Sequence, residues 1–73
     1  MKAYATIEFV TNVINNGRVV KRGIVELLSE DGKCLGLFSV FGFTKDELKD
    51  RAYMEADSNL SFKGYALESL RVI

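Results

Sequence analysis

The chain has 73 residues, and its ten basic residues balance its ten acidic residues to give no net charge. Hydrophobic residues make up 48% and charged residues 27%, a composition typical of a folded globular protein, which excludes a disordered chain. The neutral balance argues against a dedicated nucleic-acid or membrane-surface binder, because such proteins usually carry a basic excess. We therefore expect a single domain over residues 1–73.

The residues that usually carry catalysis are scarce. Histidine is absent, which removes the commonest general base and the commonest metal ligand. Cys34 is the only cysteine, so it forms no internal disulfide and favours a reducing, cytoplasmic location. The acidic residues lack the spacing of a calcium loop, and no window of about 18 apolar residues predicts a membrane span. We predict no enzyme activity, no cofactor, no metal site and no membrane association.

Two glycine turns divide the first forty residues. Asn15-Asn16-Gly17 and Glu30-Asp31-Gly32 each lie between apolar runs. Asn-Gly and Asp-Gly supply the two positive-φ residues of a type I′ hairpin turn. The flanking segments 3–14, 18–28 and 33–43 therefore predict a three-stranded antiparallel meander.

The same turns predict which residues lie opposite one another, and opposed residues share a face of the sheet. The expected pairs are Val13–Val20, Phe9–Ile24, Leu28–Leu35, Ile24–Ser39 and Arg22–Phe41. The face expected to pack against a helix then collects Ala5, Ile7, Phe9, Val13, Val20, Ile24, Leu28, Leu35, Leu37, Phe41 and Phe43.

The opposite face of this predicted meander also has an apolar centre. One interpretation is a β-bulge at Gly23 that turns part of the strand inward. The other is a partner-binding surface, because a contiguous apolar patch with a polar rim often marks an interaction site. The residues assigned to this surface are Val25, Leu27, Phe38, Val40, Lys21 and Tyr4.

A helix is predicted to follow the meander. Thr44 and Glu47 have the spacing of a capping box, and residues 48, 52 and 56 form an apolar stripe that Tyr53 or Met54 widens. The helix is expected from about 45 to 57, ending near Ser58-Asn59.

A final strand over 65–73 completes a β-β-β-α-β domain of the α+β class, with the helix packed on the sheet. Gly64 opens this strand, which pairs with the sheet on one side or on both.

The predicted helix segment 45–57 carries five acidic and three basic residues. Asp46, Glu47 and Asp50 could present negative charge to a basic groove of a protein partner. An ordinary solvated helix face is the other interpretation of these carboxylates.

A nucleic-acid interpretation is the less favoured alternative. Arg18, Lys21 and Arg22 cluster on the second strand, and aromatic residues lie on its neighbours. Small sheet domains stack single-stranded bases with such residues. Against this, the acidic helix would have to point away from the nucleic acid.

Two segments of the C-terminal part resemble segments of a known group of proteins. They are residues 44–48, Thr-Lys-Asp-Glu-Leu, and residues 64–73, Gly-Tyr-Ala-Leu-Glu-Ser-Leu-Arg-Val-Ile. The arrangement resembles small phage-encoded β-β-α-β proteins, which include inhibitors of host RNA polymerase and some anti-CRISPR proteins. The additional N-terminal strand departs from the smallest members of that group. The resemblance implies a stoichiometric inhibitor that blocks a host or defence complex by occupying a surface, and it carries no catalytic motif across.

We therefore predict a non-enzymatic protein-binding domain. The alternatives are a small single-stranded nucleic-acid-binding or regulatory protein and a homodimeric structural module whose second sheet face is the dimer interface.

Overall fold

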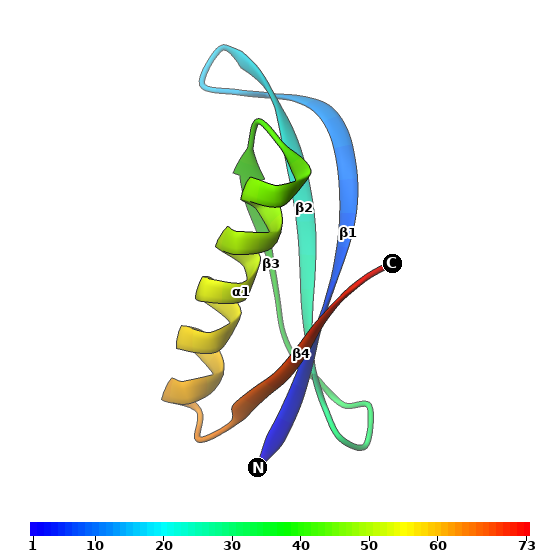
Figure 1. Ribbon diagram of the computed structural model, residues 1–73, viewed down its shortest axis with the longest axis vertical. Helices are drawn as coiled ribbons and strands as arrows, with labels where there is room; N and C mark the ends of the chain where they lie inside the picture. Colours follow the sequence, from blue (N-terminus) through cyan, green and yellow to red (C-terminus); the bar gives the residue numbers. More distant parts are fainter.

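A computed structural model of the chain contains four strands and one helix (Figure 1). It describes the backbone of all 73 residues and the side chains of residues 1–10, 13–14 and 16–73. The elements are β1 (Lys2–Asn15), β2 (Arg18–Ser29), β3 (Cys34–Gly42), α1 (Lys45–Phe62) and β4 (Ala66–Val72). This order confirms the predicted β-β-β-α-β arrangement of the α+β class.

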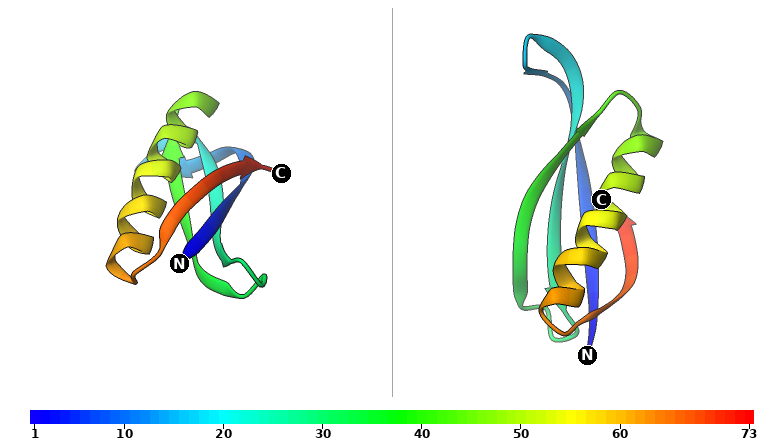
Figure 2. Two further views of the ribbon diagram at one scale, coloured as in Figure 1. Left: turned by 60° about the horizontal axis from the view of Figure 1, so that its bottom comes forward. Right: turned by 90° about the vertical axis from the view of Figure 1, so that its left-hand side faces the viewer.

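The four strands form one sheet in the order β3-β2-β1-β4. β1, β2 and β3 make the predicted antiparallel meander, whereas β4 pairs with β1 in parallel. α1 carries the chain from the β3 edge across one face of the sheet to the opposite edge, and leaves the other face uncovered (Figure 2). β3 and β4 are thus the two edges of the sheet, and each pairs on one side only.

The first hairpin turn has the predicted geometry. Asn16 and Gly17 adopt φ values of 52° and 76°, the two positive values that a type I′ turn requires. The hairpin projects beyond the N-terminal end of α1 (Figures 1 and 2), and its Ile14 and Val19 side chains are exposed.

The register between β1 and β2 differs from the prediction after the first few pairs. Val13 lies opposite Val20 as expected, but Phe9 lies opposite Gly23 instead of Ile24. The shift occurs between Val10 and Val13, where β1 has one more residue than the facing part of β2. This is a β-bulge, and because side chains alternate along a strand, one extra residue exchanges the faces beyond it.

The second turn is one residue longer than predicted. Among the residues of this turn only Gly32 has a positive φ, 86°. The Ser29 N–H donates to the Lys33 carbonyl at 2.9 Å, and the Gly32 N–H donates to the Ser29 carbonyl at 3.0 Å. These two bonds close a three-residue loop of the kind in which glycine takes the left-handed position.

The longer loop pairs Leu28 with Cys34 and not with Leu35, as had been expected. A second shift next to Leu35 restores the predicted register, so that Ile24 lies opposite Ser39 and Arg22 opposite Phe41.

Consequently, the face assignment was correct for β1 as far as the bulge and reversed for most of β2 and β3. Ala5 and Ile7 lie under α1 as predicted, but Ile24, Leu28, Leu37 and Phe41 lie on the uncovered face. The buried cluster consists of Ala3, Ala5, Ile7, Val25, Leu27, Val40, Leu48, Ala52, Ala56 and Leu60.

α1 begins as predicted and ends later. Its buried stripe contains the predicted Leu48, Ala52 and Ala56 and continues one turn further to Leu60. Tyr53 and Met54 are exposed and do not widen the stripe, contrary to the expectation.

The end of α1 has the hydrogen bonds of a Schellman motif. The Tyr65 N–H donates to the Leu60 carbonyl at 2.8 Å, and the Gly64 N–H donates to the Ser61 carbonyl at 3.0 Å. Gly64, with φ of 85°, takes the left-handed position after the helix, so the helix ends later than the predicted Ser58-Asn59.

Candidate functional site

Half of the six residues assigned to the predicted partner-binding surface lie inside the protein. Val25 and Leu27 have no exposed area and Val40 is 3% exposed, because the bulge in β1 turns these side chains toward α1. These three residues are therefore core and do not form an accessible surface. Phe38, from the same predicted patch, packs against the buried cluster but remains partly exposed.

The two remaining members of that patch lie apart from Phe38. Tyr4 lies opposite Leu28 on the uncovered face, whereas Phe38 lies opposite Val25 on the face that α1 covers. Lys21 is half-buried and lies opposite Gly42 near the far end of β3. The predicted patch is thus not one surface.

Glu47, predicted to face a partner, is used within the fold. Its backbone N–H donates to Thr44 Oγ1 at 3.1 Å, which confirms half of the predicted capping box. Its carboxylate accepts from the Phe43 N–H at 3.3 Å and from Arg51 Nη2 at 3.1 Å. Asp46 and Asp50 are exposed in the first turns of α1.

The three cations of the nucleic-acid alternative do not converge. Lys21 and Arg22 are consecutive residues of β2, so their side chains leave the sheet on opposite faces. Arg22 Nε donates to Ser39 Oγ of the neighbouring strand β3 at 3.1 Å. Arg18 lies at the start of β2, in the projecting hairpin.

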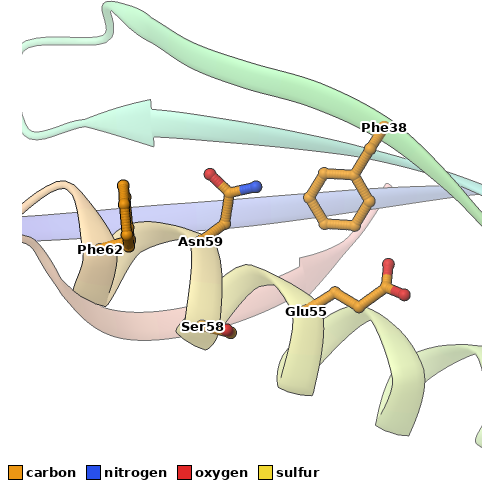
Figure 3. A pocket seen from close by; sticks show the side chains of 5 residues that line it. All are labelled: Phe38, Glu55, Ser58, Asn59 and Phe62. Atoms are coloured by element: carbon orange, nitrogen blue, oxygen red, sulfur yellow. The ribbon is translucent and has the colours of Figure 1, made fainter.

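A groove of about 480 Å³ lies between β3 and the C-terminal half of α1. Figure 3 shows Phe38 extending from β3 toward α1, with Glu55 and Asn59 beside it. Ser58 and Phe62 complete the lining, and Phe62 is 94% exposed. A groove with two aromatic rings and a few polar groups can hold apolar side chains while orienting a polar one.

β3 forms the rim of this groove and is an uncharged sheet edge. Its sequence, Cys-Leu-Gly-Leu-Phe-Ser-Val-Phe-Gly, contains no charged residue and no proline. Alternate N–H and C=O groups of an edge strand point away from the sheet, and natural proteins protect such edges with charges, proline or bulges. The opposite edge has this protection, because β4 carries Glu68 and Arg71.

Side chains bond to the backbone at the beginning of β3. Lys63 Nζ donates to the Leu35 carbonyl at 2.6 Å, and Cys34 Sγ lies 3.7 Å from the Gly36 carbonyl. From Leu37 to Gly42, no side chain that the structure describes bonds to the strand backbone. This stretch is here called the open edge.

Two other kinds of site are not found in the described part of the chain. No three histidine, cysteine or acidic side chains among residues 1–10, 13–14 and 16–73 gather as metal ligands would. No helix described by the structure has both the length and the apolar character needed to span a bilayer.

Comparison of the chain with protein-family models, with curated proteins and with solved structures found no match.

Of the residues that line the groove, Phe38 alone was predicted to bind a partner. Ser58, Asn59 and Phe62 went unassigned because the helix was expected to end near Ser58-Asn59, and Glu55 was counted only among the acids of the predicted helix. The uncharged run from Cys34 to Gly42 was a usable signal, since strands without charges are vulnerable when they lie at an edge. That β3 is an edge depends on where β4 pairs, which local patterns do not indicate.

Proposed function

We propose that this chain is a non-enzymatic protein-binding domain that accepts an extended segment of its partner as an additional strand along β3. The observation that carries the proposal is the open edge, an uncharged and unprotected stretch of strand at the side of the sheet. Strand addition of this kind draws its affinity from main-chain hydrogen bonds and its selectivity from pockets for alternate side chains.

The groove beside β3 supports this mode of binding. A strand added to β3 would place every second side chain on the side of the sheet that carries α1. There the partly exposed Phe38 and the exposed Phe62 offer apolar contact. Aromatic residues dominate the energetics of many protein interfaces, so Phe38 and Phe62 are the expected anchors.

The resemblance of the C-terminal part to small phage-encoded inhibitors supports an inhibitory effect of this binding on the partner. We propose that the domain acts in the cytoplasm by occupation, covering a segment that a host or defence complex needs for its own contacts. Such inhibition requires neither a nucleophile nor a metal, and it would be stoichiometric.

The test uses peptides selected from a ribosome-displayed library of random dodecapeptides with the full chain as target. Binding of a selected peptide should shift the backbone amide signals of residues 37–42 and slow their hydrogen exchange. Leu37→Lys should weaken binding at least tenfold, because a charge on an edge strand disfavours a further strand. Leu37 is 67% exposed, so this substitution spares the core, whereas Phe38→Asp would disturb the packing around Phe38.

Leu37→Thr is the matched control, since it removes the same apolar side chain without adding charge and should bind nearly as well as the wild type. The proposal is wrong if no peptide is enriched, or if the shifts fall on the uncovered face or on the hairpin and not on β3.

A further inference from the structure

The groove beside β3 contains a single charged side chain. Of its five lining residues, only Glu55 is ionisable at neutral pH. The nearest cations along α1 and its end have other partners: Arg51 bonds to Glu47 at 3.1 Å, and Lys63 bonds to the Leu35 carbonyl at 2.6 Å. Within the described part of the chain, Glu55 itself makes no salt bridge.

We propose that the segment added to β3 carries a lysine or arginine that meets Glu55, alternating with apolar side chains that pack on Phe38 and Phe62. This inference rests on the proposed function and specifies its partner as a basic, apolar-alternating extended peptide.

Strand geometry makes this pairing attainable. Side chains two residues apart on an added strand lie on the same face, roughly 7 Å apart. One of them can therefore contact Phe38 while the next reaches along α1 to Glu55, which lies beside Phe38 in the groove (Figure 3). The aliphatic stem of a lysine or arginine would cover the aromatic ring, and its charged end would remain in contact with water.

The length of the open edge limits the segment. Lys63 and the bulge next to Leu35 occupy the beginning of β3, so pairing is confined to Leu37–Gly42. About six residues of partner, roughly 20 Å of extended chain, fill this stretch.

The same charge disfavours a second copy of this chain as the occupant. Two β3 strands related by a two-fold axis pair antiparallel, with one residue of β3 on the axis, and pairing within Leu37–Gly42 puts Ser39 or Val40 there. Glu55 lies in the groove beside Phe38, next to these residues, so each copy would add a carboxylate and no unpaired cation to the region around the axis. Like charges facing each other at an interface oppose association.

The experiment compares peptides selected by three versions of the full chain from the random dodecapeptide library. The wild type should enrich lysine or arginine at one position, two residues from an apolar residue. Glu55→Lys should enrich aspartate or glutamate at that same position. Asp57→Lys is the matched control, because Asp57 is an exposed acid of α1 outside the groove, and it should select the same peptides as the wild type.

The contribution of the Glu55 ion pair to affinity is measured with a synthetic peptide, the tightest-binding sequence selected by the wild-type chain. Replacing its basic residue by glutamine should weaken binding roughly threefold at low salt, as expected of a partly exposed ion pair. Glu55→Gln should weaken binding of the original peptide by a similar factor and should have no further effect on the glutamine peptide.

The outcomes separate this inference from the proposed function. Peptides that bind along residues 37–42 without a preferred basic position would overturn the inference and leave strand addition intact. Failure to enrich any peptide would overturn both. A sedimentation experiment that finds a dimer of the wild type, dissociated by Leu37→Lys, would identify a second copy as the occupant and also overturn the inference.

Discussion

Gly23 occupies the most crowded glycine position in the sheet. It lies between Phe9 and Val40 in the register and faces α1. A Cβ atom at this position would lie 2.7 Å from Ile7 Cδ1 and 3.1 Å from Val40 Cγ2. Ile7 is fully buried, so its side chain has little room to move away. Glycine is thus required here by packing and not by backbone conformation.

We expect Gly23→Ala to lower the free energy of unfolding by about 1–3 kcal/mol, the usual cost of overpacking a core. Urea denaturation followed by circular dichroism measures this change. Gly36→Ala is the control, because the nearest atom to its Cβ would be Leu27 Cδ1 at 3.4 Å, an ordinary contact, and the loss should be much smaller. Equal effects of the two substitutions would contradict the packing argument.

Asp31 has a local interaction that sets its titration. The Ser29 hydroxyl donates to the Asp31 carboxylate, and this bond, aided by the Lys33 backbone, holds the pKa of Asp31 below its ordinary value of 3.8. Because the folded-state pKa is lowered, the stabilisation is present above pH 3.8 and is lost as the pH falls through the pKa of Asp31 in the folded protein. The second hairpin turn therefore weakens in acid.

Ser29→Ala should return the pKa of Asp31 toward 3.8, which a carbon-13 NMR titration of the carboxyl group detects. Ser58→Ala, in the groove far along the chain, should leave it unchanged. If the pKa of Asp31 stayed low in Ser29→Ala, the hydroxyl would not be its cause.

At the scale of elements, α1 is defined by contacts at its two ends and by one buried stripe. Thr44 Oγ1 accepts from the Glu47 N–H at 3.1 Å, while the Glu47 carboxylate accepts from the Phe43 N–H, one residue before the cap. The close approach of Glu47 depends on Gly42, where a Cβ would lie 3.1 Å from Glu47 Cδ. The cap thereby connects the end of β3 to the start of α1.

Thr44→Ala should lower the free energy of unfolding by about 1 kcal/mol, since one helix N–H loses its acceptor. Thr44→Ser retains the hydroxyl and should be close to the wild type in the same urea titration. If serine and alanine were equally destabilising, the loss would come from the threonine methyl group and not from the cap.

The predictions that were confirmed at this scale concern features set by residues close together in the sequence. The type I′ turn at Asn16-Gly17, the cap at Thr44 and the stripe from Leu48 to Ala56 all depend on residues a few positions apart. The helix end was predicted too early because Asn59 and Gly64 can both take the left-handed position, and burial of Leu60 favours the later one.

At the scale of the whole molecule, the two edges of the sheet are treated differently. β4 carries charged side chains, including Glu68 paired with Lys2 of β1 at 3.3 Å. β3 has Lys63 across its beginning and no ion pair among the side chains that the structure describes. An exposed edge strand can pair with a partner, but it can also pair with other copies of the chain and cause aggregation. The extent of β3 that stays covered therefore affects both binding and aggregation.

Lys63→Ala should lengthen the open edge toward Cys34 and make the chain aggregate several-fold faster, as measured by light scattering during incubation at high concentration. Lys49→Ala removes an equal charge from an exposed position of α1 and should not change the rate. Equal acceleration by both substitutions would show that loss of a positive charge, and not exposure of the Leu35 carbonyl, is responsible.

The amino-acid sequence by itself determined the elements and the local signals that begin and end them, because these rest on interactions between near neighbours. Only the tertiary structure decided the faces and the edges. The extra residue of β1 before Val13 turned Val25, Leu27 and Val40 from a predicted surface into core, since one residue of register reverses a strand. The crossing of α1 to the far side of β1 left β3 as an edge, beside a groove lined by Phe38 and the last turns of the helix. Both outcomes depend on contacts between distant segments, and such contacts leave no periodic pattern in the chain.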